Sequence, residues 1–333
     1  MRVIVTGSSG FLGSWICRVL SVKHDVIALV RPSSDTYRLK NIDGLQIERC
    51  GNDDWADFIV AEKPDVLILA DWWGVGNHDR NDGRQFENID RMEIRAAAAR
   101  NADVALVIGV GSQAELGPVS NRITEDLPDN PTTEYGKAKV AARKIMQNSL
   151  AGSKTRFAWL RIFSTYGACD TDTWLIPQLI DTLTKGEFMD LTKGEQEWSY
   201  LHAFDLACAF GAVIESESTA GVVNVGNPQT VILKDAIHII ANQLGAKGVL
   251  GFGKLAYRPD QVMKLEPACE SLTAIGWTPV VSFENGITQT IHWQNRESLT
   301  PLRCEDGQEI SFDLRFAKDY FGRRRLNQLH HAG

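Results

Sequence analysis

Short apolar runs alternate with longer amphipathic stretches through the first half of the chain. The apolar runs have the length of strands and cover residues 3–5, 26–30, 45–47, 66–69, 104–108 and 157–160. The amphipathic stretches have helical spacing and cover residues 11–22, 53–62, 84–101 and 132–149. Apolar strands separated by helices are typical of a parallel sheet with helices on both faces. The pattern therefore predicts a doubly wound α/β fold.

The alternation weakens after about residue 167, and turn residues become frequent, as in residues 193–195 and 226–228. We expect residues 1–167 to form the doubly wound domain. Residues 168–294 are expected to form mostly a smaller, mixed α/β domain that holds the substrate, with segments that return to the main sheet. The remaining residues, 295–333, form a C-terminal extension without an assigned role. Its basic run is interpreted as a solvated end or a packing arm.

Composition narrows the function classes. The chain has 333 residues, with 35 Lys and Arg against 42 Asp and Glu, and its net charge of −7 argues against nucleic-acid binding. None of its apolar runs approaches the ~20 residues that span a bilayer, so no membrane partner is expected. The six cysteines are scattered without a C-x-x-C pair, so neither disulfides nor a metal site are expected. These features favour a cytoplasmic location.

A glycine-rich turn follows the first predicted strand and opens the first predicted helix. Residues 6–13 read T-G-S-S-G-F-L-G, which is the spacing G-x-x-G-x-x-G. In this position the pattern predicts a Rossmann-type loop whose backbone and following helix N-terminus hold the diphosphate of a dinucleotide. The predicted cofactor-binding residues of this loop are Gly7, Ser9, Gly10, Phe11, Leu12 and Gly13.

The end of the second predicted strand bears on which dinucleotide is bound. It carries Arg31 and Ser33, whereas the first acidic residue, Asp35, comes late. An acid at the strand end would bind the ribose hydroxyls of NAD, but an arginine there can neutralise the 2′-phosphate of NADP. NADP is therefore favoured over NAD. A role for Arg31 as a solvated loop cation stays open.

A second motif predicts acid–base chemistry. Tyr135 and Lys139 stand four residues apart, on one face of a predicted helix, and Ser112 follows the fifth predicted strand. A phenol has an ordinary pKa of about 10, and a neighbouring cation favours its ionised form. Ser112, Tyr135 and Lys139 are therefore the predicted catalytic set, with Tyr135 and Lys139 also contacting the cofactor.

With these motifs the sequence resembles the extended short-chain dehydrogenase/reductase family, the nucleotide-sugar epimerase, dehydratase and reductase group. The likeness covers roughly residues 1–294 and places Ser112, Tyr135 and Lys139 on the family's catalytic positions. Further matches are residues 166–167, 201–205, 224–226, 258–260 and 276–279. The resemblance implies a nucleotide-sugar substrate, a nicotinamide dinucleotide and a homodimer.

Departures from the family's pattern favour one activity over others. The family's dehydratases carry Asp-Glu after the catalytic hydroxyl residue, and its 3,5-epimerase/reductases carry a cysteine two residues after it. Here Ser112 is followed by Gln113 and Ala114. These replacements argue against dehydration and 3,5-epimerisation. Of the family's reactions, hydride transfer at a hydroxyl or ketone carbon is the one that stays compatible with the sequence. A narrower likeness to CDP-abequose-synthase-like 4-ketoreductases lies in residues 111–115 and 192–198.

The predicted substrate-binding residues combine retained and altered family positions. Trp198 replaces a family arginine, Ser164 replaces an asparagine, and Arg258 is retained. After the fourth predicted strand comes an unusual aspartate with paired tryptophans. The candidates are Asp71, Trp72, Trp73, Gln113, Ser164, Trp198 and Arg258. For Trp198 a core position, and for the tryptophan pair a loop packed over the sheet edge, are the alternatives.

Together the motifs predict an NADP-dependent 4-ketoreductase of a nucleotide-activated sugar. An epimerase that retains NAD and acts at the same carbon is the first alternative. A reductase of a small non-nucleotide ketone and a non-catalytic dinucleotide-binding protein are further alternatives.

Overall fold

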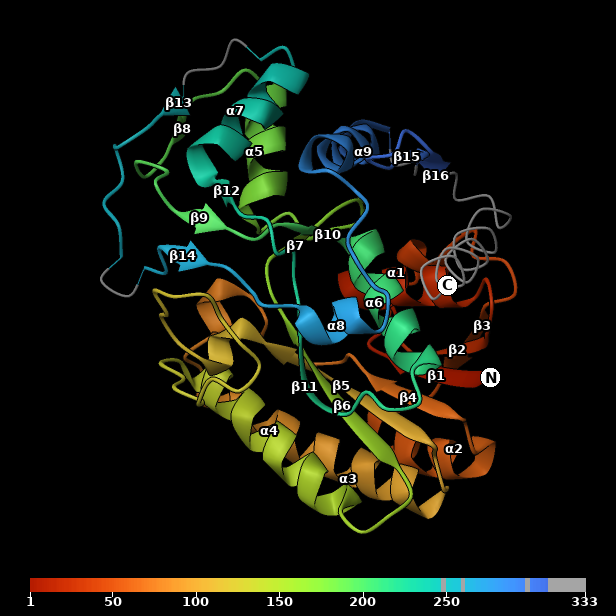
Figure 1. The fold of residues 1–333 in the computed structure, drawn as a ribbon. Helices are drawn as coiled ribbons and strands as arrows, with labels where there is room; N and C mark the ends of the chain where they lie inside the picture. Colours follow the sequence, from red (N-terminus) through yellow and green to blue (C-terminus); the bar gives the residue numbers. More distant parts are fainter. Residues whose placement is uncertain (247–249, 259–260, 297–299, 311–333) are drawn as a thin grey trace, which may run out of the picture.

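The core of the fold is one seven-stranded parallel sheet (Figure 1). The computed structural model describes residues 1–246, 250–258, 261–296 and 300–310. The strand order across the sheet is β11-β6-β5-β4-β1-β2-β3. The strands are β1 (Arg2–Thr6), β2 (Asp25–Val30), β3 (Gln46–Arg49), β4 (Val66–Leu69), β5 (Leu106–Ser112), β6 (Arg156–Ile162) and β11 (Gly221–Val225). The order confirms the doubly wound α/β prediction.

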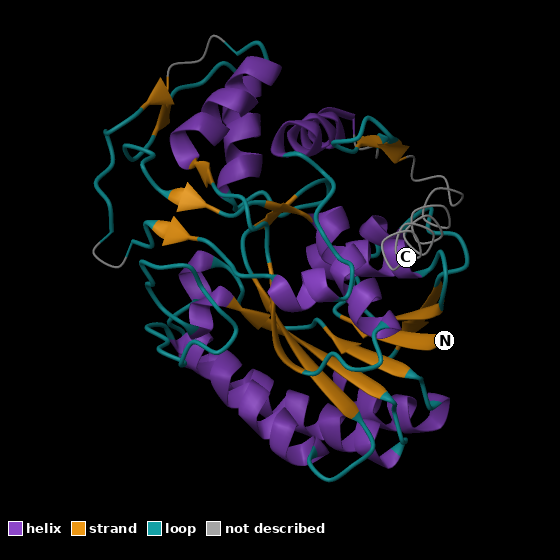
Figure 2. Ribbon diagram, in the orientation of Figure 1, coloured by secondary structure: helices purple, strands orange, loops and turns teal. Residues whose placement is uncertain are grey.

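Helices cover both faces of this sheet (Figure 2). One face carries α1 (Phe11–Leu20) and α6 (Ala203–Glu215), and the other carries α2 (Trp55–Glu62), α3 (Glu87–Asn101) and α4 (Glu134–Leu150). Side chains of successive strand residues point to opposite faces of the sheet. Val3 and Val5 pack in one core, and Ile4 packs in the other. Burial on both faces explains why strands such as β2 and β4 are apolar, whereas the edge strand β3 is exposed and mostly polar.

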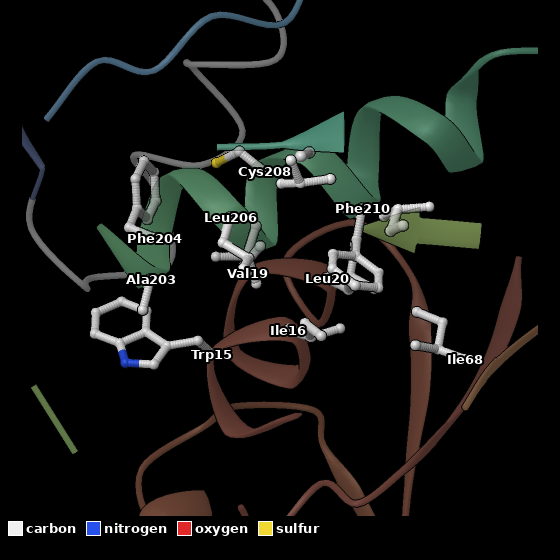
Figure 3. Packing of buried hydrophobic residues seen from close by; sticks show 14 of the residues in the cluster. Trp15, Ile16, Val19, Leu20, Ile68, Ala203, Phe204, Leu206, Cys208 and Phe210 are labelled. Carbon is white, nitrogen blue, oxygen red and sulfur yellow. The ribbon is translucent and has the colours of Figure 1, made fainter. Parts of the chain in front are cut away.

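The core on the α1 side joins segments that lie far apart in the sequence. Figure 3 shows α1 packed along α6, with Trp15 beside Ala203 and Leu20 near Phe210. Trp15 also donates a hydrogen bond from its indole Nε1 to the carbonyl oxygen of Ala168, at 2.8 Å. The first helix is therefore fixed by residues from the second half of the chain.

A smaller group of elements lies beside the main sheet (Figure 1). Its helices are α5 (Leu175–Thr184), α7 (Leu233–Gln243) and α9 (Phe283–Arg296). Its short strands pair as β8 (Met189–Asp190) with β13 (Leu250–Gly251), and as β9 (Glu197–Trp198) with β12 (Val231–Ile232) and β14 (Lys264–Leu265). Strand β7 (Thr165–Tyr166) pairs with β10 (Leu201–His202). This group has a core of its own, formed mainly by α5, α7 and α9.

Some later segments belong to the main sheet. Strand β11 pairs with β6, α6 packs against α1, and α8 (Glu270–Ala274) lies near β11. Strands β15 (Leu302–Arg303) and β16 (Glu309–Ile310) form a hairpin that buries Leu302 and Ile310 in the α1-side core. This part of the C-terminal extension is a packing arm, whereas the basic run at 323–325 lies outside the described residues. The domain boundaries near 167 and 294 stay predictions.

Short 3₁₀ helices complete the described chain. They are η1 (Tyr37–Leu39), η2 (Asn52–Asp54), η3 (Asn77–Asp79), η4 (Gly83–Phe86) and η5 (Gln113–Glu115). Among the helices of the described residues, none has both the length and the apolar character that a bilayer crossing requires. Within the same residues, His, Cys, Asp and Glu side chains do not gather in groups of three or more suited to a metal ion.

Candidate active site

The glycine loop turns from β1 into α1 and leaves the first helical amides open. Gly10 is the N-cap in extended backbone, without a side-chain cap, and the first turn carries no acidic residue. A Cβ on Gly13 would lie 2.3 Å from the carbonyl oxygen of Gly7, so only glycine allows this close approach. The first amides of a helix lack partners inside it and favour anions. The loop therefore fits the diphosphate of a dinucleotide.

The loop after β2 presents Arg31 to solvent. Within the described part of the chain, its guanidinium has neither a hydrogen bond nor an ion pair, and Ser33 is also exposed. Arg49 holds the loop by donating to the carbonyl oxygens of Pro32 and Ser34, both at 3.0 Å. Asp35 accepts from the backbone of the following turn at 2.9 Å. Arg31 is thus available to an anionic ligand.

Ser112, Tyr135 and Lys139 meet at the carboxyl edge of the sheet. Ser112 is the last residue of β5, and its hydroxyl lies near enough to the Tyr135 phenol to favour a lower phenol pKa. Lys139 donates from Nζ to the carbonyl oxygen of Val110 at 2.8 Å. Gly136 permits the contact between α4 and the strand end, since a Cβ there would lie 2.3 Å from the Ala114 carbonyl oxygen. The predicted catalytic residues are therefore neighbours in the fold.

Burial shifts the pKa values of both ionisable members. It raises the pKa of Tyr135, while the neighbouring Ser112 hydroxyl and the charge of Arg80 act in the opposite direction. It lowers the pKa of Lys139 to about 7, against the favourable charges of Glu115 and Asp71. Both shifts follow from the cost of placing a charge away from water.

The segment after β4 lies against this pair. The Trp72 indole lies 3.7 Å from the Lys139 Nζ, measured to the ring centroid, and meets the Tyr135 ring edge-on at 6.2 Å. Gln85 accepts the Trp72 Nε1 hydrogen bond at 2.8 Å and so fixes the indole. Trp73 instead packs beneath the Arg84 guanidinium, 4.2 Å from its ring centroid. Of the predicted tryptophan pair, Trp72 contacts the predicted catalytic residues Tyr135 and Lys139.

Arg80 is a site residue that the sequence did not single out. Its guanidinium carbon lies 5.5 Å from the centroid of the Tyr135 ring, and its carbonyl oxygen accepts the Tyr135 backbone N–H at 2.8 Å. It occurs in the polar run of residues 77–82, which carries no periodic signal. Only the contact with α4 distinguishes it from its neighbours.

Asp71 is engaged by other side chains at the end of β4. Its oxygens accept hydrogen bonds from the Thr6 hydroxyl and from the buried guanidinium of Arg95. Arg95 also stacks over Trp55, with 4.3 Å between its guanidinium carbon and the ring centroid. The carboxylate of Asp71 therefore links β1, the end of β4 and α3.

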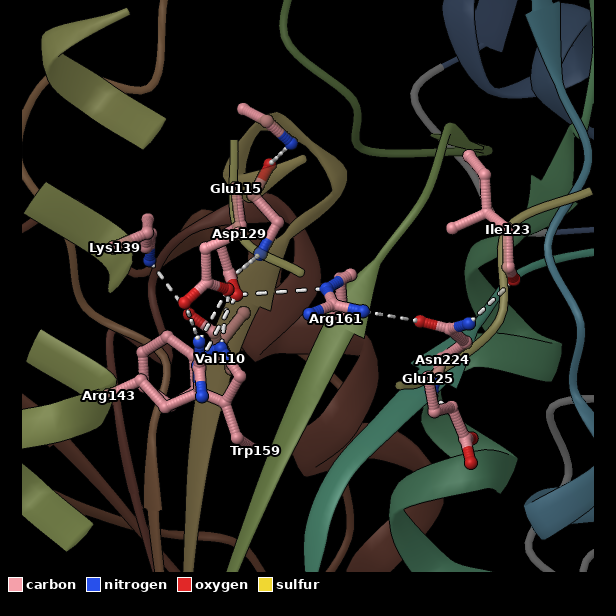
Figure 4. A network of polar contacts seen from close by, with 12 residues as sticks. Val110, Glu115, Ile123, Glu125, Asp129, Lys139, Arg143, Trp159, Arg161 and Asn224 are labelled. Atoms are coloured by element: carbon pink, nitrogen blue, oxygen red, sulfur yellow. Dashed lines mark hydrogen bonds and ion pairs between the residues drawn. The ribbon is translucent and has the colours of Figure 1, made fainter. Parts of the chain in front are cut away.

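A buried acid, Glu115, contacts the backbone of Ser112 and is the centre of a polar network (Figure 4). Both the backbone N–H of Ser112 and the indole of Trp159 donate to Glu115 Oε1, at 2.8 and 2.9 Å. The other carboxylate oxygen forms ion pairs with Arg143 and Arg161, at 3.6 and 3.7 Å. Glu115 and Ser112 thus form a reciprocal capping box on η5.

The same network extends to the far edge of the sheet (Figure 4). Arg161 donates to the Asn224 side chain at 3.3 Å, and Asn224 donates to the carbonyl oxygens of Ile123 and Ala268. Glu125 accepts the backbone N–H of Asn224 at 3.0 Å. The turn after Ser112 is therefore tied to β6, β11 and the segment before α8.

The other predicted substrate residues occupy varied surroundings. Gln113 and Ser164 are half-buried, and Arg258 is exposed. Trp198 stacks on Tyr200, with 6.3 Å between ring centroids, and packs in a small apolar cluster with Leu116, Ile123, Phe163 and Leu265. That position agrees with the packing alternative for Trp198. Its indole nitrogen is nevertheless buried and lacks a hydrogen-bond partner in the described structure.

With this geometry in place, comparison with known proteins identifies the family. Residues 3–226 match the model of the NAD dependent epimerase/dehydratase family. The chain belongs to this family. It is therefore an enzyme of the short-chain dehydrogenase/reductase type, as the motifs predict, and the cofactor of the family is a nicotinamide dinucleotide.

Similar curated proteins have several activities. An uncharacterized UDP-glucose epimerase of Bacillus subtilis is 23% identical over 308 residues, which cover 87% of this chain and 97% of the relative. A 2′-dehydrokanamycin reductase of Streptomyces kanamyceticus is 26% identical over 229 residues, covering 67% and 60% of the chains. A CDP-abequose synthase of Salmonella muenchen is 26% identical over 137 residues, covering 40% and 47%.

Solved structures share the fold. The UDP-N-acetylglucosamine 4-epimerase of Methanobrevibacter ruminantium has a TM-score of 0.80 at 21% identity, covering 89% of this chain and 99% of that one. The UDP-glucose 4-epimerase of Thermus thermophilus, solved with NAD, has a TM-score of 0.79 at 20% identity, covering 89% and 100%. At these identities the likeness establishes the fold alone.

Proposed function

We propose that this enzyme reduces the 4-ketone of a nucleotide-activated sugar with NADPH. The observation that carries the proposal is the meeting of Ser112, Tyr135 and Lys139 beside an open glycine loop. The turn that follows Ser112 supports reduction over dehydration, because Gln113 and Ala114 provide neither the acid nor the base that elimination of water requires.

In this proposal Tyr135 is the general acid. A bound dinucleotide supplies a hydride to the carbonyl carbon, and the Tyr135 phenol donates its proton to the carbonyl oxygen, so the ketone becomes an alcohol. Ser112 donates a hydrogen bond to the same oxygen, which orients it and stabilises the charge that develops there. Lys139 holds the cofactor ribose and favours the tyrosinate that remains after proton transfer.

Arg31 supports NADP as the cofactor. It is exposed beside the end of β2, together with Ser33, and the surrounding loop is already held by Arg49. A guanidinium without a partner suits a 2′-phosphate. The diphosphate is assigned to Gly7, Ser9, Gly10, Phe11, Leu12 and Gly13 of the glycine loop.

Substrate binding is assigned to residues around the catalytic set. Arg258 supplies a positive charge for the diphosphate, and Gln113 and Ser164 are half-buried donors and acceptors. Trp72 and Asp71 shape the wall beside Lys139, while Trp73 packs under Arg84 and Trp198 packs against Tyr200. A homodimer and a cytoplasmic location stay predictions, and sedimentation of the purified protein tests the first.

A 4-epimerase that retains NAD is the second candidate. It is favoured by the epimerase of Bacillus subtilis, of which this chain covers 97%, and by the NAD bound in the Thermus thermophilus structure. Both reactions need the same proton transfer at the oxygen of carbon 4. They differ in whether the dinucleotide leaves after each turnover.

Cofactor consumption separates the candidates. The purified protein is first screened by thermal shift with NAD, NADP and nucleoside diphosphates. It is then incubated with UDP-, dTDP- and CDP-linked 4-keto sugars and NADPH, and separately with UDP-glucose alone. Stoichiometric NADPH oxidation that Tyr135→Phe abolishes is the expected result. Interconversion of UDP-hexoses without cofactor loss would establish the epimerase instead, and the absence of stabilisation by every nucleoside diphosphate would overturn both.

A further inference from the structure

A permanently charged side chain lies against the phenol of Tyr135. The Arg80 guanidinium carbon is 5.5 Å from the centroid of the Tyr135 ring. The carbonyl oxygen of Arg80 accepts the Tyr135 backbone N–H at 2.8 Å, so the two backbones are joined directly. The loop between η3 and η4 therefore holds Arg80 in a fixed relation to the first turn of α4.

Among the described residues, no carboxylate forms an ion pair with Arg80. Its Nε is buried and has no hydrogen-bond partner, and its guanidinium forms no ion pair with any residue that the structure describes. The charged neighbour that acts on it, besides Tyr135, is Arg258, which has the same sign. An unpaired charge in a partly buried setting is weakly screened. The electrostatic interaction between the Arg80 guanidinium and the Tyr135 phenol is therefore stronger than it would be in water.

The other groups around the phenol do not replace this charge. The Ser112 hydroxyl at the end of β5 favours a lower phenol pKa, and the Glu115 carboxylate on η5 acts in the unfavourable direction. Lys139, on α4 itself, has its Nζ 5.7 Å from the Tyr135 centroid but only 3.7 Å from that of Trp72. Its pKa of about 7 means that it loses its proton above neutral pH, whereas a guanidinium keeps its charge.

We propose that Arg80 is a positioning residue for Tyr135, a second cation that holds the phenol ring and stabilises the tyrosinate that forms when the proton leaves. On the sequence alone, the electrostatic role is assigned to Lys139. The inference goes beyond the proposed reaction, because any reaction in which Tyr135 exchanges a proton would use Arg80 in the same way.

Direct titration of Tyr135 tests the proposal without a substrate. The tyrosinate absorbance that is lost in Tyr135→Phe isolates this residue from the other tyrosines. In Arg80→Gln its midpoint is expected to rise by roughly one pH unit, whereas Arg80→Lys, which keeps a positive charge, is expected to restore most of the shift. Arg84→Gln, in the same loop but exposed and paired with Asp82, is the matched control and should leave the midpoint in place.

Two outcomes would overturn the assignment. One is an unchanged Tyr135 midpoint in an Arg80→Gln protein whose melting temperature equals that of the wild type. The other is an equal shift in Arg80→Gln and Arg80→Lys, which would show that packing and not charge matters. Because no turnover is measured, neither outcome depends on whether the protein reduces a sugar nucleotide.

Once a substrate is known, kinetics give a second readout. Arg80→Gln is expected to lower kcat about tenfold near neutral pH, to change KM little, and to move the pH dependence of kcat upward with the phenol. A raised KM with unchanged kcat would instead place Arg80 among the substrate-binding residues and would contradict the proposal.

Discussion

The backbone N–H of Ser112 donates a hydrogen bond to the buried carboxylate of Glu115, with 2.8 Å between N and Oε1. The same carboxylate balances Arg143 and Arg161, and it accepts the indole hydrogen of Trp159. The residue whose hydroxyl we propose as catalytic is thus positioned by an acid to which the proposed reaction gives no chemical role. Removing the charge of Glu115 affects both the stability of the fold and the orientation of Ser112.

Glu115→Gln is expected to lower the free energy of unfolding by about 3–5 kcal/mol, because it leaves the buried guanidinium of Arg161 without an ion-pair partner in the described structure, while Arg143 keeps Asp129. Urea denaturation followed by tryptophan fluorescence measures the change. Glu134→Gln is the control, since Glu134 pairs with Lys137 on the exposed side of α4 and should cost less than about 1 kcal/mol. Equal stability of the Glu115 and Glu134 variants would show that the network contributes little.

Tyr135→Phe is expected to lower kcat by about 10²–10⁴-fold and to change dinucleotide affinity much less, because the variant loses the acidic hydroxyl but keeps the ring and Lys139. Ser112→Ala should lower kcat by a smaller factor. Steady-state kinetics together with a fluorescence titration of the dinucleotide separates these effects. Tyr37→Phe, at an exposed tyrosine after β2, serves as the control. A Tyr135→Phe protein with wild-type turnover would rule out the acid–base assignment.

Arg31→Ala is expected to weaken NADP binding about 10–100-fold and to leave NAD binding unchanged, because only NADP carries the 2′-phosphate. Isothermal titration calorimetry with both dinucleotides measures the selectivity. Lys40→Ala removes another exposed cation between β2 and β3 and should leave the selectivity for NADP over NAD unchanged. If Arg31→Ala weakens both dinucleotides equally, Arg31 supports the loop and does not select the cofactor.

Gly13→Ala is expected to abolish dinucleotide binding and to destabilise the protein, since its methyl group would press on the Gly7 carbonyl oxygen and the Ser8 Cα. Thermal melts with and without dinucleotide report both effects. The matched variant Gly83→Ala adds the same methyl group in open space and should behave as the wild type. A Gly13→Ala protein that still binds dinucleotide would contradict the close packing of this loop.

Lys139→Met is expected to stabilise the fold at about pH 6, by roughly 2–4 kcal/mol, while it removes activity. The pKa of Lys139 is lowered to about 7 in the folded state, below its ordinary value near 10.4 in the unfolded chain. Between these values the unfolded chain binds more protons, so the contribution of Lys139 to stability increases with pH. The advantage of the variant should therefore shrink toward about pH 10.

Denaturation of both proteins across this pH range tests the linkage, since other titrating groups act equally on each. A stability difference that does not vary with pH would show that folding does not lower the pKa of Lys139. Lys137→Met, at the exposed neighbour on α4, should give a small and pH-independent change.

Most of the sheet is predictable from the sequence because both faces of its strands are buried. The runs at 66–69 and 26–30 correspond closely to β4 and β2, while the strand predicted at 104–108 is observed as Leu106–Ser112. That strand extends through glycine and serine, which carry no apolar signal, because it is paired with β6 along its whole length. Strand ends therefore depend on neighbours and not on local pattern.

The sequence by itself determined the doubly wound sheet, the glycine loop and the pairing of Tyr135 with Lys139. The sheet follows from the alternation of strand and helix patterns, and the other two features depend on spacing within one short segment. The tertiary structure decided the contacts of Arg80 with Tyr135, Trp72 with Lys139, and Glu115 with Arg161. These join residues from separate loops and strands, whose meeting depends on how the helices pack on the sheet and has no periodic signature in the sequence.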